Sequence, residues 1–280
     1  MKKNFLYFLQ KLSENKTLIS FFLRKLFRES KFLSTKSLIQ LNASIRPEYA
    51  YCAYYSAKLA KKLSYKKISF IEFGVAKGNG LIYLENLAER IEKELDIEIE
   101  IYGFDTGEGL IQPTDYRDLP YFFKGGMYKM DVEKLKNRLN RSKLILGDVK
   151  HTAKSFFVNN KPAPIAAIFN DLDYFSSTKN SFQIFDTDIK NFLPRVFCYF
   201  DDVIGSAEEM YSEYTGELLA IKDFNDNNEN RKLSLNKNLQ HLDTIWKNQI
   251  YYLHNFEHLK YNNFIDPDEQ IDINKSIVLK

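Results

Sequence analysis

Acidic residues follow two short apolar runs of the chain, at the point where each run ends. Asp171 comes just after the run 165–169, and Asp201 with Asp202 follows the run 196–200. The carboxyl ends of neighbouring parallel strands meet at one edge of a sheet, where the strands lie roughly 5 Å apart. The three carboxylates are therefore predicted to converge. Such a cluster repels itself and loses hydration unless protons or a cation compensate.

Hard oxygen ligands without histidine or cysteine favour Mg²⁺, with Ca²⁺ or Mn²⁺ as alternatives. We therefore predict a metal site formed by Asp171, Asp201 and Asp202; the alternative is that some of these acids cap helices or face water. A hydroxyl held by such a cation loses its proton more easily, and Asp171 is the predicted base that takes it. The nearby Asp173 is predicted to cap a helix that begins near 176–177.

A glycine-rich turn follows another apolar run, at 68–73. Glycines stand at positions 74, 78 and 80, a spacing that differs from the dinucleotide-binding G-x-G-x-x-G and disfavours an NAD-dependent enzyme. Glycine lets the chain turn tightly from strand to helix, and it lets backbone N–H groups approach a ligand closely. This longer turn suits a ligand without phosphates. A purely structural turn of another α/β protein is the alternative.

Two further acidic residues end the next two predicted strands. Asp105 stands where a carboxylate can accept hydrogen bonds from ribose hydroxyls, or where it can cap a turn. Asp148 stands where an adenine would lie, and its carboxylate either accepts from the adenine amino group or caps the following helix. Together with the glycine turn, these positions favour a nucleoside-containing cofactor.

The elements that must position these residues alternate along the chain from residue 66. Apolar runs predict strands at 68–73, 97–104, 143–146, 165–169, 196–200, 233–235 and 250–253. Helical patterns cover 48–64, 81–95, 132–139, 153–157, 182–192 and 208–224, and the Asn-rich stretch 225–231 is a predicted loop. This alternation predicts a doubly wound, mostly parallel sheet. The stretch 107–130 lacks periodicity and carries four glycines and two prolines, so we predict a functional loop such as a lid.

The N-terminal region 1–45 is basic and amphipathic. Its apolar residues recur at helical spacing, which predicts a helical cap or a dimer arm; the alternative is contact with anionic lipid or an acidic partner. We divide the chain into an N-terminal helical extension, 1–64, and a cofactor-binding domain, 65–280. No run reaches the ~18 apolar residues of a membrane span, and the run near residue 5 is too short for a signal peptide.

Composition narrows the classes of protein. The 280 residues include 40 basic and 37 acidic ones, a formal net charge of +3, which gives no support to a nucleic-acid partner. Eleven glycines and seven prolines are too few for a disordered or collagen-like chain. Two cysteines, Cys52 and Cys198, exclude a disulfide framework and a cysteine-rich metal site. We expect a reducing, cytoplasmic environment.

Four segments, in this order, resemble known motifs. The turn at 72–80 resembles motif I of class I S-adenosylmethionine (SAM) methyltransferases. The segments Phe-Asp-Thr-Gly-Glu-Gly-Leu at 104–110, Asp-Leu-Asp-Tyr-Phe-Ser-Ser-Thr at 171–178 and Phe-Asp-Asp at 200–202 resemble the macrocin O-methyltransferase family. Members of that family are Mg²⁺-dependent, SAM-using enzymes that methylate sugar hydroxyls of natural products. The resemblance covers about residues 66–205.

The resemblance implies an α/β, Rossmann-like class I methyltransferase fold, with a doubly wound, seven-stranded, mostly parallel sheet and an N-terminal helical extension. It implies that Asp171, Asp201 and Asp202 hold Mg²⁺ and that Asp171 is the catalytic base. It places SAM against residues of the glycine turn and of the next two strand ends. These predicted cofactor-binding residues are Glu72, Gly74, Val75, Gly78, Asp105, Thr106 and Asp148.

The implied function is SAM-dependent O-methyl transfer to a sugar or glycan hydroxyl with Mg²⁺ assistance. A phenolic or other small-molecule hydroxyl is one alternative acceptor, and a non-catalytic SAM-binding scaffold is another alternative. We expect a small-molecule acceptor, no nucleic acid, and either a membrane contact or a homo-oligomer formed through the N-terminus. The sequence departs from the family at Gly107, where an aromatic residue is usual, and at Phe175, where a tyrosine is usual.

Other residues carry weaker signals. Glu217 is predicted to form an ordinary helix ion pair, for example with Lys222 or with a neighbouring element, and contact to the metal or acceptor is the alternative. His151 is predicted to lie at the surface or cap a helix, with contact to the cofactor or acceptor as the alternative. His254 and His258 share an i, i+4 spacing and are predicted to have a structural or acceptor-pocket role.

The lid also carries two cations that bear on the acceptor. Arg117 and Lys124 either bind the phosphate of a nucleotide-linked or phosphorylated sugar or are solvated charges of the loop. The sequence leaves both interpretations open.

Overall fold

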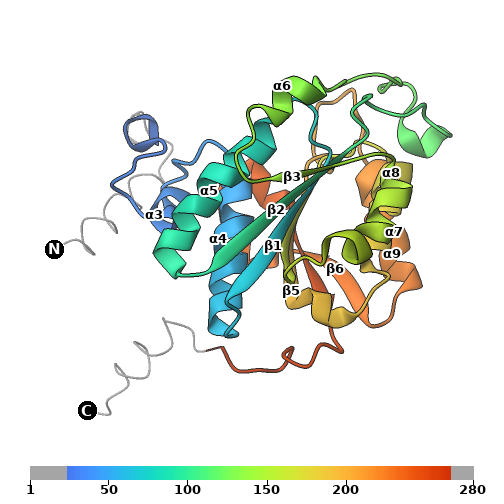
Figure 1. Ribbon diagram of the computed structural model, residues 1–280. Coiled ribbons are helices and arrows are strands. Elements are labelled where there is room, and N and C mark those ends of the chain that lie inside the picture. The colour runs from blue at the N-terminus through green and yellow to red at the C-terminus, as the bar shows by residue number, and fades with distance from the viewer. Residues whose placement is uncertain (1–23, 266–280) are drawn as a thin grey trace, which may run out of the picture.

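The structure is a computed structural model that describes residues 24–265 of the chain. A seven-stranded sheet lies at its centre, in the order β3-β2-β1-β4-β5-β7-β6 (Figure 1). The strands are β1 (Lys67–Phe73), β2 (Glu98–Asp105), β3 (Lys143–Leu146), β4 (Ile165–Asn170), β5 (Phe192–Phe200), β6 (Arg231–Leu235) and β7 (Ile250–Asn255). Strands β1 to β5 run parallel, and β7 and β6 pair antiparallel beside β5. The predicted doubly wound, mostly parallel sheet is confirmed.

Helices cover both faces of the sheet. On one face lie α4 (Pro47–Lys62) and α5 (Asn79–Leu95), and on the other lie α7 (Val149–Asn160), α8 (Phe175–Ser181) and α9 (Gly216–Asn227) (Figure 1). The short helix α3 (Thr35–Gln40) packs against α4, and α6 (Val132–Lys136) lies near the carboxyl edge of the sheet. This three-layer arrangement leaves the carboxyl edge free for a ligand.

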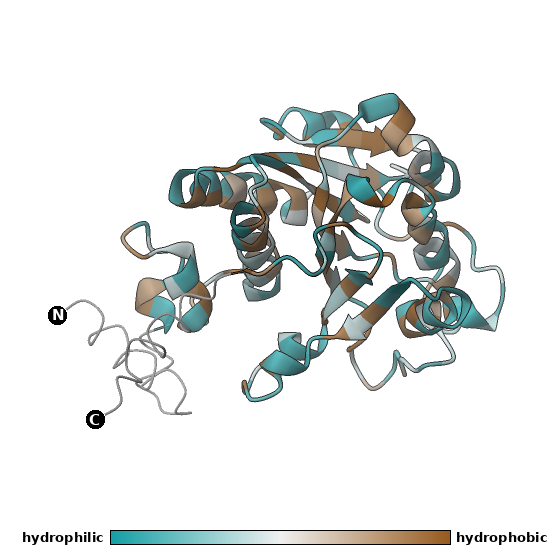
Figure 2. Cartoon of the chain, turned by 90° about the horizontal axis from the view of Figure 1, so that it is seen from below, coloured by the Kyte–Doolittle hydropathy of each residue, from teal (hydrophilic) through white to brown (hydrophobic). Residues whose placement is uncertain are grey.

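The apolar pattern of the sequence explains these layers. Strand β4 is buried along its whole length, as a strand covered on both faces requires. Helix α5 buries Leu81, Leu84, Ala88 and Ile91, which recur every three or four residues and form one apolar stripe. In Figure 2 the apolar residues concentrate in the sheet and on the inner sides of the helices, whereas the outer turns are hydrophilic.

The register of four strands brings their carboxyl ends level. Phe73 pairs with Phe104 on one side and with Asn170 on the other, and Asn170 pairs with Phe200. The next residue of each strand therefore stands in one row along this edge: Asp105, Gly74, Asp171 and Asp201. The sheet thus places the glycine turn and the acidic residues beside one another.

The prediction was least accurate between β4 and β6. The helix predicted over 182–192 is wrong, because two short 3-10 turns follow α8 and β5 already begins at Phe192. Phe182 and Phe185 are buried and stack on each other from a 3-10 turn, so their spacing imitated a helical stripe. The helix predicted over 208–224 begins only at Gly216 and ends at Asn227, so the predicted loop 225–231 is shortened.

The N-terminal part of the chain joins the core through α4. This helix confirms the prediction over 48–64 and packs against α5, β4 and β5. Residues 1–23 lie outside the described part of the chain, so the predicted amphipathic arm and its membrane contact or oligomeric role stay predictions. Within residues 24–265, no helix has both the length and the apolar character needed to cross a membrane.

Candidate functional site

A cavity of about 340 Å³ opens at the carboxyl edge of the sheet. Its lining comes from three places: the glycine turn with the ends of β2 and β3, the loops after β4 and β5, and the predicted lid. Among the predicted site residues, those that line the cavity are Gly74, Asp105, Thr106, Asp148, Asp171, Asp201 and Asp202. The sheet therefore brings most of the predicted cofactor residues and all predicted metal ligands to one cavity.

Gly74 joins the two ends of this cavity. Its φ of +82° lies in the left-handed region that glycine adopts freely. A Cβ atom at this position would lie 1.7 Å from the backbone oxygen of Asp171. Only glycine therefore lets the turn after β1 approach the loop after β4 so closely.

The carboxylate of Asp105 builds the glycine turn. Its Oδ2 accepts hydrogen bonds from the backbone N–H groups of Val75 and Ala76, both at 2.9 Å, and its Oδ1 accepts from the N–H of Gly107 at 2.7 Å. This negative charge thus pins the turn after β1 to the end of β2 while it lines the cavity. Val75 and Gly78 shape the turn without lining the cavity; Gly78 has a φ of +78° at the start of α5.

Glu72 does not line the cavity. Its Oε1 accepts a hydrogen bond from the hydroxyl of Tyr49 at 2.8 Å, and its Oε2 is buried without a partner among the described residues. Burial raises the pKa of Glu72 to about 8, against the opposing effects of the Tyr49 hydrogen bond and the charge of Arg46. The structure therefore places Glu72 beneath the turn, between β1 and α4, and does not bring it into the cavity lining.

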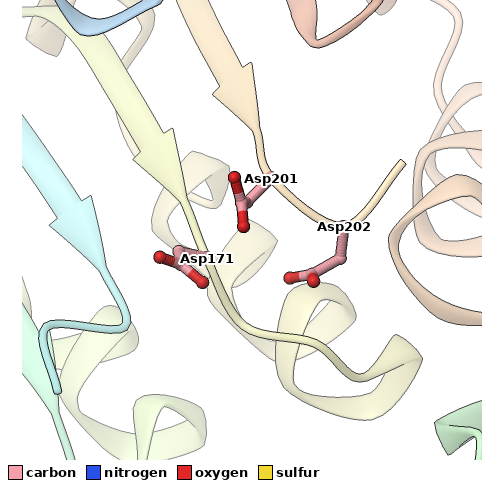
Figure 3. Close-up of side chains that lie close together, drawn as sticks. All are labelled: Asp171, Asp201 and Asp202. Carbon is pink, nitrogen blue, oxygen red and sulfur yellow. The ribbon is translucent and has the colours of Figure 1, made fainter. Parts of the chain in front are cut away.

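Three aspartates meet at the other end of the cavity. One carboxylate oxygen from each of Asp171, Asp201 and Asp202 lies within 4.8 Å of the others. Figure 3 shows Asp171 at the end of β4 and the other two at the end of β5, with their carboxylates gathered around one space. The predicted convergence of the trio is therefore present in the structure.

Hydrogen bonds from neighbouring elements orient Asp201 and Asp202. The hydroxyl of Tyr199 donates to Oδ1 of Asp201. Asp202 is held at both oxygens: its Oδ2 accepts from the backbone N–H of Asp173, and its Oδ1 accepts from the hydroxyl of Tyr211, both at 2.9 Å. Such outer contacts fix the direction of a ligand side chain.

The contacts of Glu217 differ from those predicted from the sequence. The predicted ion pair with Lys222 is wrong, because Lys222 instead pairs with Asp226 at 2.9 Å. Glu217 is fully buried in the first turn of α9, where its Oε2 accepts the backbone N–H of Asp202 at 3.0 Å. Burial, together with the nearby charge of Asp202, raises the pKa of Glu217 well above its usual range. The glutamate supports the loop that carries two of the three aspartates.

Two carboxylates at this end remain without hydrogen bonds from the described residues: those of Asp171 and Asp173. The predicted helix cap by Asp173 is wrong, because α8 starts after Tyr174 and Asp173 lines the cavity instead. Burial and the charges of Asp202 and Asp201 raise the pKa of Asp173 to about 9. The same causes raise the pKa of Asp171 well above its usual range, and burial raises that of Asp202 to about 7.

The trio fits a divalent cation. All donors are carboxylate oxygens, the ligands that Mg²⁺ and Ca²⁺ prefer, and opposed oxygens stand about 4 Å apart around Mg²⁺ and about 5 Å apart around Ca²⁺. The three oxygens lie within 4.8 Å of one another, which leaves room for such an ion, and Mg²⁺ would draw them closer together. Burial, together with the repulsion between these carboxylates, raises their pKa values, and a bound cation would offset both effects.

The stretch 107–130 forms one wall of the cavity and is fastened to the core. Leu110, Ile111, Phe123 and Tyr128 of this stretch line the cavity. The fully buried Asp118 accepts from the backbone N–H of Ser176 at 2.8 Å and from its hydroxyl at 2.9 Å, which ties the stretch to the start of α8. The serine pair of the 171–178 motif was the available signal for this contact, but the sequence did not reveal that Asp118 is the partner.

Asp148 caps a helix, which is one of the two functions that the sequence left open, and it also lies at the cavity. Its Oδ1 accepts from the backbone N–H of Lys150 at 2.8 Å and so caps α7, while the side chain also lines the cavity. His151 is exposed on α7 and does not line the cavity, in keeping with a surface residue.

The remaining candidates do not line this cavity. His254 lies in β7, not in a helix, and contacts Ser234 and Tyr261, while His258 contacts Tyr65. Their structural role is favoured, and the acceptor-pocket role is not. Arg117 and Lys124 also lie outside the lining.

Sequence reasoning missed residues of the loop between β5 and α9. Glu209 lines the cavity, and the hydroxyl of Tyr211 donates to Asp202 and, at 3.3 Å, to Glu209. Both fell inside the helix predicted over 208–224. The signal that was available is Gly205 together with the absence of a regular apolar stripe before Gly216, which indicates a loop.

Comparisons with known proteins show what this architecture resembles. No family model matches the chain, and no curated protein matches it in sequence. The crystal structure of CalS11, a calicheamicin methyltransferase, is 19% identical, covers 90% of this chain and 91% of its own, and has a TM-score of 0.51. An apo structure of CalS11, described as a TDP-rhamnose 3'-O-methyltransferase, is 18% identical, with 84% and 92% covered and a TM-score of 0.44.

A third solved structure is an O-methyltransferase from Bacillus cereus in complex with S-adenosylhomocysteine (SAH). It is 11% identical, with 82% of this chain and 95% of that chain covered and a TM-score of 0.41. At such identities a likeness shows the fold, and the fold conclusion rests on the first CalS11 structure. The seven-stranded, mostly parallel sheet of this chain is therefore the Rossmann-like fold of the class I methyltransferases.

Proposed function

We propose that the protein is a SAM-dependent O-methyltransferase that transfers a methyl group to a sugar or glycan hydroxyl, with Mg²⁺ held by Asp171, Asp201 and Asp202. One observation carries the proposal: a single cavity joins the glycine turn after β1 to the carboxylate trio after β4 and β5. A site for a nucleoside-containing methyl donor and a site for a hard cation thereby share one space. The class I methyltransferase fold supports the proposal.

SAM would lie at the end of the cavity formed by β1, β2 and β3. Phe73, Phe104 and Val149 provide apolar lining there, and Asp105 and Asp148 provide carboxylates. One oxygen of Asp148 caps α7, which leaves the other to accept from an adenine amino group. SAM carries a sulfonium, so a negatively charged cavity favours it.

In the proposed reaction, the bond between the sulfonium sulfur and the methyl carbon breaks, and both electrons stay on sulfur. The acceptor oxygen forms the new bond to carbon, and its proton passes to Asp171, which accepts no hydrogen bond from the described residues. Bound Mg²⁺ would lower the pKa of the acceptor hydroxyl and orient it. Because the methyl donor is already activated, positioning and proton removal are the main contributions of the protein.

A phenolic acceptor is the second candidate, and one observation favours it. Phe123 and Tyr128 line the cavity, and aromatic rings pack on a flat phenolic ring as well as on the face of a sugar. The unpartnered carboxylates of the acceptor end favour a polyhydroxylated ligand, which can donate several hydrogen bonds, so we prefer the sugar.

Methyl transfer from tritium-labelled SAM to a panel of sugars, glycosides and phenols tests the proposal. We expect label in a sugar product with Mg²⁺, and loss of that product with EDTA and in Asp201→Asn. Asp226→Asn is the matched control, because this aspartate is exposed on α9 and pairs with Lys222. Label in phenols alone, or transfer that EDTA leaves unchanged, would contradict the proposal.

A further inference from the structure

The acceptor end of the cavity holds more carboxyl groups than a metal site requires. Asp173 and Glu209 line it beside the proposed metal ligands. In all, seven carboxylates line the cavity: Asp105, Asp148, Asp171, Asp173, Asp201, Asp202 and Glu209. Over residues 24–265, no lysine, arginine or histidine belongs to the lining.

Asp173 is a buried residue whose carboxylate faces the cavity. The residue is only 7% exposed, and no described side chain or backbone group donates a hydrogen bond to its carboxylate oxygens. Its own backbone N–H donates to Asp202, which holds the residue in place. Its carboxylate oxygens are accessible from the cavity and hold no protein donor, so they are free to accept from a ligand that supplies donors.

Glu209 is held beside the same space by the loop between β5 and α9. Its carboxylate accepts from the hydroxyl of Tyr211 at 3.3 Å and from the backbone N–H of Ser206. Its backbone oxygen accepts from the hydroxyl of Tyr121 at 2.8 Å, which links this loop to the stretch 107–130. The second carboxylate is therefore positioned by the protein.

Two cations of the stretch 107–130 are engaged elsewhere. The guanidinium of Arg117 donates to both oxygens of Asp115, with a closest distance of 2.7 Å, and lies over the ring of Phe175. Lys129 pairs with Glu108 at 2.6 Å. Neither of these two side chains offsets the charge of the acceptor-end carboxylates inside the cavity.

We propose, as an extension of the proposed function and resting on it, that the acceptor places no phosphate or carboxylate in the cavity: its reacting part is a neutral or amino sugar that donates hydrogen bonds to Asp173 and Glu209. A divalent cation and the cationic methyl donor offset the charge of the trio and of the cofactor end. Asp173 and Glu209 then accept from hydroxyl or ammonium groups, and a lining without a cationic side chain offers no partner to a phosphate or carboxylate. This acceptor differs from TDP-rhamnose, the sugar nucleotide named for CalS11.

The test compares three forms of each sugar in a panel of hexoses and 6-deoxyhexoses: the methyl glycoside, the sugar 1-phosphate and the nucleoside-diphosphate sugar. Transfer of tritium from SAM is measured with Mg²⁺, and SAH binding is measured separately by calorimetry. We expect kcat/KM for the methyl glycoside to exceed that for either phosphorylated form at least about tenfold, because like charges would meet in a partly buried site. Amino sugars are expected to perform at least as well as their neutral counterparts.

Variants of the two lining residues provide the second part of the test. We expect Glu209→Gln to reduce the ratio of kcat/KM for the methyl glycoside to kcat/KM for the sugar 1-phosphate at least about threefold. SAH affinity should not change. Asp173→Asn removes one acceptor oxygen, and we expect it to lower kcat/KM for the methyl glycoside at least about threefold, likewise without a change in SAH affinity. Glu213→Gln is the matched control, because Glu213 is exposed on the same loop and does not line the cavity.

Three outcomes count against the inference and are distinguishable. A phosphorylated form preferred by the wild type would overturn it, and so would Glu209→Gln and Asp173→Asn variants that change neither the ratio nor kcat/KM for the methyl glycoside. Transfer to none of the sugars, with SAH bound, would instead contradict the sugar acceptor of the proposed function, and this inference would fall with it.

Discussion

The two ends of the cavity use carboxylates in opposite ways. At the β1–β2 end, Asp105 accepts three backbone N–H groups and holds a turn together. At the β4–β5 end, Asp171 and Asp173 accept none from the described residues, and burial and mutual repulsion raise their pKa values. The first carboxylate stabilises the scaffold, whereas the second group stays costly until a cation or ligand arrives.

The same row of strand ends supplies both regions, and Gly74 lies between them, where it joins the two ends of the cavity. Its missing Cβ lets the turn touch the backbone of Asp171. The difference between the ends therefore arises from what surrounds each carboxylate, and less from its place in the sheet. Donors of the glycine turn surround Asp105, whereas other acids surround Asp171.

The largest effect on activity is expected from a substitution in the carboxylate trio at the β4–β5 end of the cavity. We expect Asp202→Asn to lower methyl transfer at least about a thousandfold, because the variant removes a charged metal ligand at the reacting centre. SAH affinity should change less than about threefold, because the cofactor end remains intact. Initial rates and calorimetry measure the two effects, with Asp226→Asn as the control. A near-normal rate would show that the trio is not a catalytic metal site.

A substitution at the β1–β2 end of the cavity should instead affect stability and SAH affinity. We expect Asp105→Ala to lower the free energy of unfolding by about 2–3 kcal/mol and SAH affinity at least about tenfold, since three N–H groups lose a charged acceptor. Mg²⁺ affinity should change much less. Asp105→Asn keeps one acceptor oxygen, so its unfolding free energy and SAH affinity should lie between those of the wild type and Asp105→Ala. Chemical denaturation and calorimetry measure these quantities, and an SAH affinity unchanged in Asp105→Ala would contradict a cofactor site at this turn.

A smaller effect is expected from substitution of Glu217, which accepts the backbone N–H of Asp202 at the β4–β5 end of the cavity. Glu217→Leu leaves the N–H of Asp202 buried without an acceptor, so we expect a loss of about 1–3 kcal/mol in unfolding free energy and weaker Mg²⁺ binding. Glu217→Gln retains an acceptor oxygen and should recover most of both. If both variants bind Mg²⁺ equally weakly, the charge of Glu217 matters and its hydrogen bond does not.

The smallest effect concerns pH. Groups whose pKa is raised by folding bind more protons in the native state, so stability falls as pH rises from the unfolded to the folded pKa and then levels off. Folding raises the pKa values of Asp202, Glu72 and Asp173 from 3.8, 4.5 and 3.8 to about 7, 8 and 9, so this fall extends from about pH 4 to about pH 9. We expect the melting temperature to decrease over this range by a few degrees, and Mg²⁺ to raise it more at high pH than at low pH. A Mg²⁺ effect equal at both pH values would contradict relief of repulsion in the trio.

Sequence reasoning recovered the sheet and the strand ends because both depend on local signals. Continuous apolar runs predict strands buried on both faces, and an aspartate directly after such a run must lie at the carboxyl edge. Asp171, Asp201 and Asp202 could therefore be placed together from the residue pattern alone. Their convergence needed only the order of two neighbouring strands.

The contacts that surround these residues could not be predicted in the same way. Glu217 lies 15 residues after Asp202 and looks like any acidic residue of a first helical turn, where a helix ion pair is the ordinary expectation. Asp173 has the residue type and spacing of a helix cap. Burial decided both cases, and burial depends on how α8, α9 and the loop before α9 pack, which periodicity alone does not reveal.

Titration of SAH into the wild-type protein by calorimetry, once with Mg²⁺ and once with EDTA, tests the division of the cavity most directly. We predict binding under both conditions, with dissociation constants that agree within about threefold, because the cofactor end is built by Gly74 and Asp105 without the metal trio. Absence of binding under both conditions would contradict a SAM site at the glycine turn, and binding that disappears with EDTA would contradict the separation of the two ends.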